Sequence, residues 1–201
     1  MDKDGGEYGL FHWIAPIYGL FYSYQKRHYN AILDKMKNKV DLSLFNTIID
    51  TGCGTGALCS VLNQRGLKVT GVEQVQKMLD IASKKEGNKN INFIQANILE
   101  GIPVEDKSFN VSIASFVAHG LKENERKIMY KEMRRITKDL VIIYDYNKQR
   151  YIPIDIVEWL EGGDYFNFIE KAYTEMKESF DDVQVINVST WASWYIGVPT
   201  K

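Results

Sequence analysis

The chain has 201 residues, of which 45% are hydrophobic and 25% are charged, a composition typical of a globular protein. Its formal net charge is −1, and no run of lysine and arginine is long enough to follow a nucleic-acid backbone, so we expect no nucleic-acid substrate. The only cysteines, Cys53 and Cys59, suit neither a disulfide framework nor a four-ligand zinc site. We therefore expect reduced thiols, a cytoplasmic location and no metal.

The most aromatic part of the chain is residues 8–24, which a proline, a glycine and polar residues interrupt. This segment falls short of the roughly 18 apolar residues that span a bilayer, and it lacks the basic start and cleavage site of a signal peptide. From Ser23 to Lys39 apolar residues recur with helical spacing. Within a single domain of residues 1–201, we expect residues 1–40 to form a helical cap on a core of residues 45–201, with no membrane span.

After the cap, short β-branched runs alternate with helical stripes of apolar residues. The predicted strands are residues 47–50, 67–73, 91–95, 109–114, 140–144, 183–188 and 194–198. The predicted helices begin near residues 57, 75, 123 and 166. Seven strands that alternate with helices predict an α/β fold, a Rossmann-like three-layer αβα sandwich. We expect its seven-stranded sheet to be mostly parallel, with an antiparallel last strand.

A heptad that begins at Asp50 lies between the first predicted strand and the first helix behind it. Its glycines, Gly52, Gly54 and Gly56, stand at alternate positions and let a ligand approach the backbone at the start of a helix. Such a turn can hold a pyrophosphate, but Asp50 would repel one and would attract the ammonium of an amino-acid group. Glu73, at the end of the second strand, can accept both hydroxyls of a ribose. Asp50 therefore favours S-adenosylmethionine over a dinucleotide, whereas Glu73 only supports this reading, because NAD-binding proteins share that feature.

Two stretches of the chain, residues 48–56 and 71–74, resemble the glycine motif and the ribose-binding motif of class I S-adenosylmethionine-dependent methyltransferases. The resemblance extends over residues 13–198 and is strongest to the broad group that includes the ubiquinone and menaquinone biosynthesis C-methyltransferases. It implies methyl transfer to a small-molecule acceptor. It also implies further cofactor contacts through Gln74, Asn97, Ile98 and Ser115.

Two positions depart from the pattern of this family, because Asn97 and Asn110 stand where acids are usual. The side-chain oxygen of Asn97 can still accept a hydrogen bond from the adenine amine, and Ile98 would then stack on the ring. The two departures keep open a protein that binds the cofactor without transferring its methyl group. A small NAD(P)-dependent oxidoreductase is the other alternative, since the glycines also fit a loose dinucleotide pattern.

Methyl transfer from a sulfonium is an in-line displacement, so the protein mainly has to orient the reactants. His119 follows the fourth predicted strand and is the candidate base for a hydroxyl, a phenol or an acidic carbon. Tyr144, at the end of the fifth strand, is the second candidate catalytic residue, and its neighbours Asp145 and Tyr146 could also contact the acceptor. The acceptor atom, carbon, oxygen, nitrogen or sulfur, stays open, and so does the oligomeric state.

Overall fold

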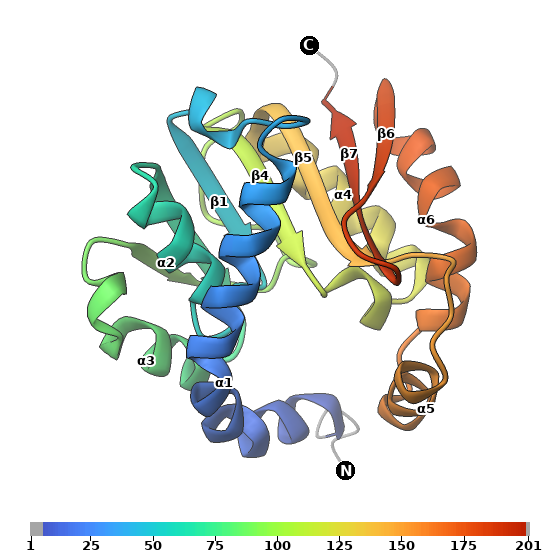
Figure 1. The fold of residues 1–201 in the computed structure, drawn as a ribbon, viewed down its shortest axis with the longest axis horizontal. Helices are drawn as coiled ribbons and strands as arrows, with labels where there is room; N and C mark the ends of the chain where they lie inside the picture. The colour runs from blue at the N-terminus through green and yellow to red at the C-terminus, as the bar shows by residue number, and fades with distance from the viewer. Residues whose placement is uncertain (1–5, 200–201) are drawn as a thin grey trace. The chain divides into compact units, whose positions relative to one another are not determined.

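The structure is a computed structural model that describes residues 6–199, with side chains over residues 21–160 and 162–199. Figure 1 traces the chain. The chain forms two compact units, which meet in sequence between Asn97 and Ile98. The expected division into a cap of residues 1–40 and a core of residues 45–201 stays a prediction.

The first unit contains a three-stranded parallel arrangement with the order β3-β2-β1. Ile48 and Ile49 of β1 are completely buried, as expected of a parallel strand that is covered on both faces. The elements are α1 (Gly6–Met36), a 3₁₀ turn η1 (Leu42–Leu44), β1 (Thr47–Thr51), α2 (Ala57–Gln64), β2 (Lys68–Glu73), α3 (Gln76–Lys84), η2 (Glu86–Asn88) and β3 (Asn92–Gln95).

The long helix α1 begins at Gly6, well before the expected start near Ser23. Two polar contacts hold its second half against the rest of the first unit. The Tyr22 hydroxyl donates to Asn88 Oδ1 at 3.2 Å, and the Arg65 guanidinium pairs with Asp34 at 2.8 Å. Within residues 6–199, no helix combines the length and the apolar character that a membrane crossing requires.

The second unit contains four strands in the order β4-β5-β7-β6, with β4 parallel to β5 and β7 antiparallel to both of its neighbours (Figure 1). Its elements are β4 (Phe109–Ser115), η3 (Ala118–Gly120), α4 (Glu123–Ile136), β5 (Thr137–Tyr146), α5 (Ile152–Glu161), α6 (Tyr165–Ser179), β6 (Asp182–Asn187) and β7 (Ala192–Val198). All seven expected strands are therefore present, and the expected α/β class, mostly parallel with an antiparallel last strand, is confirmed.

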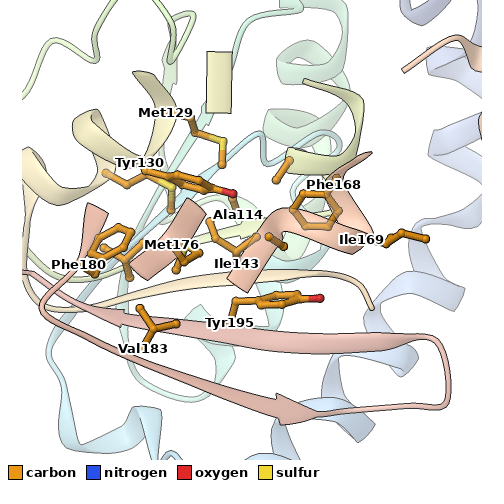
Figure 2. Packing of buried hydrophobic residues seen from close by; sticks show 14 of the residues in the cluster. Ala114, Met129, Tyr130, Ile143, Phe168, Ile169, Met176, Phe180, Val183 and Tyr195 are labelled. Carbon is orange, nitrogen blue, oxygen red and sulfur yellow. The ribbon is translucent and has the colours of Figure 1, made fainter. Parts of the chain in front are cut away.

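The core of the second unit lies between the helices α4 and α6 and the strands β5 and β7. Figure 2 shows Met129 and Tyr130 of α4 and Phe168 of α6 packed in one cluster with Ile143 and Tyr195 from the strands. These residues are all nearly or completely buried. Burying a side chain of this size contributes about 1.5–3 kcal/mol. The cluster therefore fixes the strand ends that carry the candidate chemistry of this unit.

The helix α5 was not predicted, because its apolar residues do not face inward. Ile152, Trp159 and Leu160 are 70–73% exposed, while the acids Asp155 and Glu158 are largely buried. A method that looks for an apolar stripe facing the core cannot recognise such a helix. A proline in its first turn and a left-handed glycine, Gly162, at its end mark its limits.

Candidate functional site

The glycine turn of the first unit connects β1 to α2 and has the conformation that its sequence suggests. Gly52, Gly54 and Gly56 have φ angles of 79°, 52° and 74°, a region that other residues rarely adopt. A Cβ atom on Gly54 would meet nothing within 4 Å, whereas one on Gly56 would lie 2.7 Å from the side-chain nitrogen of Asn88. Gly54 therefore leaves room for a ligand to approach the backbone, and Gly56 is required for packing.

Asp50, near the end of β1, is 1% exposed and has one oxygen that is paired and one that is not. Its Oδ2 accepts a hydrogen bond from Cys59 Sγ at 3.2 Å, and its Oδ1 is buried with no partner among the described residues. Burial raises the pKa of Asp50 to about 7; the Cys59 hydrogen bond opposes this shift and the charge of Glu73 adds to it. An unpaired buried oxygen costs about 1–3 kcal/mol, so this position suits an incoming hydrogen-bond donor.

Glu73, at the end of β2, accepts hydrogen bonds from the backbone of the glycine turn and of the residues after β2. The sequence predicts only its contact with the ribose. Its Oε2 accepts from the Gly54 N–H and its Oε1 from the Val75 N–H, both at 3.0 Å. Burial raises the pKa of Glu73, and these N–H groups partly oppose the shift. Each carboxylate oxygen has a second lone pair, so both oxygens can still accept a ribose hydroxyl.

The remaining cofactor candidates of the first unit follow β2 and β3. Gln74 is exposed directly after Glu73, and its carbonyl accepts from the side chain of Gln95 at 3.3 Å. Asn97 is half-buried and follows Ala96, whose N–H donates to the Glu73 carbonyl at 3.2 Å. The structure therefore brings Gln74 and Asn97 to the strand end that carries Glu73.

In the second unit, His119 contacts a fully buried carboxylate at the end of β5. His119 Nδ1 lies 2.8 Å from Asp145 Oδ1, and the exposed fraction of the Asp145 side chain is 0%. The same carboxylate accepts backbone hydrogen bonds from Ala118, His119 and Tyr146 at 3.0, 3.3 and 2.8 Å. With its oxygens fixed in this way, Asp145 orients the imidazole and favours the proton on Nδ1.

The turn between β4 and His119 contains an unusual backbone conformation. Phe116 has a φ of 54°, although it is not a glycine, and its N–H donates to the Tyr144 carbonyl at 2.8 Å. Its ring packs 4.8 Å from the ring of Tyr144 and 5.2 Å from that of Tyr146, measured between centroids. Strained backbone of this kind often occurs at functional sites.

The other candidates of the second unit are more deeply buried. The Tyr144 side chain is 1% exposed, and burial, with the charge of Asp145 added, raises its pKa. Tyr144 lies opposite Ser115 on the neighbouring strand, and Ser115 Oγ is buried with no partner among the described residues. Ile98 packs against the core cluster of this unit. Tyr144 as a catalytic group stays a prediction, as do the cofactor contacts of Ser115 and Ile98.

Two features of this site were missed by the sequence reasoning. The strained conformation of Phe116 has no signature in the sequence. Glu158, on the unpredicted helix α5, lies with its Oε2 3.5 Å from His119 Nε2. The sequence analysis predicts Asp145 only as a possible acceptor contact, although an acid and a histidine at the ends of successive strands are a signal for such a pair.

Known proteins resemble the chain both in sequence and in fold. A family described as "Methyltransferase domain" matches residues 49–144. The chain is 32% identical over 196 residues to the ubiquinone biosynthesis O-methyltransferase of Rickettsia bellii, covering 92% of this chain and 75% of that protein. The corresponding O-methyltransferase of Rickettsia akari is 30% identical over 197 residues, covering 92% and 72%.

A solved structure of a protein from Methanococcus maripaludis, described as an S-adenosyl-L-methionine-dependent methyltransferase, superimposes with a TM-score of 0.71 at 19% identity. It covers 93% of this chain and 92% of that one, which confirms the Rossmann-like fold. Magnesium protoporphyrin IX methyltransferase from Synechocystis, solved with bound S-adenosylhomocysteine, superimposes with a TM-score of 0.62 at 13% identity, over 87% and 83% of the two chains.

The curated relatives decide between the functions that the sequence left open. They are methyltransferases, and their alignments cover 92% of this chain. The oxidoreductase alternative and the alternative without transferase activity are thereby set aside, and S-adenosylmethionine is the cofactor. The chain belongs to the family of S-adenosylmethionine-dependent methyltransferases.

Proposed function

We propose that this methyltransferase acts on a hydroxyl oxygen of a small molecule, most readily a phenol, and that His119 accepts the hydroxyl proton. The observation that carries the proposal is the 2.8 Å contact between His119 Nδ1 and the buried Asp145. The relatives in Rickettsia, which are O-methyltransferases by name, support oxygen as the acceptor atom. The buried phenol of Tyr144 is a second catalytic candidate. A cytoplasmic location fits Cys53 and Cys59, which are free thiols and not joined in a disulfide.

A neutral hydroxyl is a weak nucleophile, and a positioned base raises its reactivity by about 10²–10⁴-fold. Asp145 holds the proton on Nδ1, so the lone pair of Nε2 is the one that takes up the acceptor proton. The Asp145 charge then stabilises the imidazolium that forms. Because the carboxylate is fixed by three backbone N–H groups, this arrangement needs no reorganisation during the reaction.

The residues of the first unit fit the amino-acid and ribose groups of S-adenosylmethionine. The unpaired Asp50 Oδ1 suits the ammonium, and Glu73 suits the ribose hydroxyls. The space beside Gly54 lets the amino-acid group of the cofactor approach the backbone. Further contacts, proposed from the family resemblance, come from Gly52, Gly56, Gln74, Asn97, Ile98 and Ser115. When bound, the cofactor supplies a methyl group that its sulfonium already activates.

We expect S-adenosylhomocysteine to bind the wild-type protein more weakly below pH 7 than above it. Asp50 is mostly protonated below its pKa of about 7, whereas the ammonium of the ligand binds the charged form more strongly. The affinity therefore decreases below pH 7, and the decrease approaches about tenfold for each pH unit. Titration calorimetry at pH 6 and pH 8 measures this difference. Asp50→Asn is expected to bind more weakly at both pH values and to lose the pH dependence, and an unchanged slope in this variant contradicts the assignment.

The same pKa shift affects the stability of the protein without cofactor. The folded chain keeps the Asp50 proton up to about pH 7, whereas the unfolded chain releases it near pH 4. The free energy of unfolding is therefore expected to fall as the pH rises from about 4 to about 7, because the unfolded state then binds fewer protons than the folded state. Urea unfolding at several pH values checks the sign, with Asp50→Asn as the control that lacks this contribution.

The acceptor class is tested by incubating the protein with isotopically labelled S-adenosylmethionine and matched acceptors that offer a phenol, an aromatic amine, a thiol or an acidic carbon. Mass spectrometry and NMR then identify the methylated atom. We expect methyl ethers of the phenols. Methylation confined to nitrogen, sulfur or carbon acceptors contradicts the proposal, while the family assignment is tested separately by the binding of S-adenosylhomocysteine.

A further inference from the structure

The imidazole of His119 lies between two buried carboxylates from different elements. Asp145 of β5 is 2.8 Å from Nδ1, and Glu158 of α5 is 3.5 Å from Nε2. The exposed fractions of the two acidic side chains are 0% and 5%. The proposed function uses only the Asp145 contact, so the presence of Glu158 at the reactive nitrogen requires its own explanation.

Apolar packing does not account for the position of Glu158. Its helix exposes Ile152, Trp159 and Leu160 to solvent while it buries acids, the reverse of the usual preference. Burying a carboxylate is costly unless specific partners compensate for it. Asp155 accepts a hydrogen bond from the Tyr165 hydroxyl at 2.9 Å, and Glu158 Oε2 lies 3.5 Å from the Nε2 atom of His119.

Among the described side chains, three titratable groups lie beside His119. From β5 come Asp145 and Tyr146, whose ring centroid is 4.9 Å from the imidazole. From α5 comes Glu158, which also interacts with the Tyr146 hydroxyl. Burial, and after it the charge of Glu158, raises the pKa of Tyr146, so this phenol stays neutral and acts as a donor. The carboxylates of Asp145 and Glu158 both lie beside the imidazole and both favour its protonated form.

We propose that Glu158 is a positioning residue that strengthens His119 as a base by stabilising the imidazolium formed during methyl transfer. This inference rests on the proposed function. The acceptor O–H bond breaks and its proton moves to Nε2. The oxygen lone pair forms the bond to the methyl carbon, whose bond to the cofactor sulfur breaks, and the leaving group is S-adenosylhomocysteine. The new N–H group then lies toward Glu158, while Nδ1–H stays on Asp145. The proton later leaves to solvent, which restores neutral His119.

The inference predicts that Glu158 shifts the titration of His119 upward. An opposite charge within about 4–6 Å stabilises the protonated form and moves a titration by about 1–3 pH units. Glu158→Gln keeps the shape of the side chain and removes the charge. Asp155→Asn is the matched control, because Asp155 lies on the same helix and also faces inward, but its partners are Tyr165 and Arg150.

The experiment follows the imidazole signals of the ¹⁵N-labelled full chain by NMR as a function of pH. The chain has three histidines, and the signal that disappears in His119→Gln identifies His119. In the wild type we expect a midpoint above the ordinary value of about 6.5. In Glu158→Gln we expect the midpoint to fall by about 1 pH unit or more, and in Asp155→Asn to stay at the wild-type value. The rate of methyl transfer to a phenol should decrease at low pH, and the midpoint of this decrease should shift in each variant by the same amount as the NMR midpoint.

A wild-type midpoint at or below about 6.5 overturns the inference without any variant, and so remains decisive if Glu158→Gln does not fold. An equal shift in both variants also overturns it, because the effect would then come from the position of α5 and not from the Glu158 charge. If methylation occurs only on atoms other than oxygen, the proposed function fails, whereas the NMR comparison still reports on Glu158 alone.

Discussion

His119→Gln is expected to lower the rate of methyl transfer to a phenol by about 10²–10⁴-fold, the contribution typical of a positioned general base. The glutamine side chain can hydrogen-bond to Asp145, but it cannot accept a proton at neutral pH. The affinity for S-adenosylhomocysteine should stay at the wild-type value, because the residues proposed to bind the ammonium and the ribose belong to the first unit. Steady-state kinetics and calorimetry measure the two quantities on the same preparation.

A matched control for this variant is His28→Gln, which removes another partly buried histidine from α1. Its rate of methyl transfer should stay close to that of the wild type. If His119→Gln retains more than about one tenth of the wild-type rate with neutral phenols, His119 does not supply general-base catalysis of the expected size.

Arg126→Ala is expected to lower the free energy of unfolding by about 3–5 kcal/mol, the typical result of breaking a buried ion pair. Arg126 of α4 is completely buried. Its Nε and Nη2 donate to the two oxygens of Glu175 on α6, both at 2.7 Å, and its Nη1 donates to Asp164 at 2.8 Å. The alanine variant leaves the buried carboxylate of Glu175 without its counter-ion. Urea unfolding at neutral pH measures the loss.

Lys171→Ala provides the control for this prediction, because it breaks an ion pair between the same two helices at the surface. Lys171 pairs with Glu123 at 2.9 Å, and the two side chains are 51% and 38% exposed. Exposed pairs contribute about 0–1 kcal/mol, so the effect should be small. Similar losses in the two variants would mean that burial of the Arg126 network does not determine its contribution.

The strands and the glycine turn could be predicted because local signals determine them. β1 is a β-branched run that a glycine-rich turn ends, and three of those glycines need left-handed φ angles. Glu73 could be predicted at the end of β2, where the structure has it. Its bond to the Gly54 N–H could not, because it depends on the distance between two strand ends in the folded chain.

The chemistry of the second unit was only partly predictable. His119 stood out because it follows β4, but its partner Asp145 is 26 residues away, and only the parallel pairing of β4 with β5 brings them together. Glu158 could not be found at all, since its helix hides acids and exposes apolar residues. Patterns based on apolar burial fail where a helix is held by polar contacts.

The most direct test of His119 as the base compares phenols of different acidity in the wild type and in His119→Gln. A base is needed for a phenol that is neutral at the pH of the assay and is not needed for one that is already ionised, such as a nitrophenol. We expect the variant to lose about 10²–10⁴-fold with the neutral phenol and to approach the wild-type rate with the ionised one. An equal loss with both phenols would contradict the account, because His119 would then act in binding or in structure and not in proton transfer.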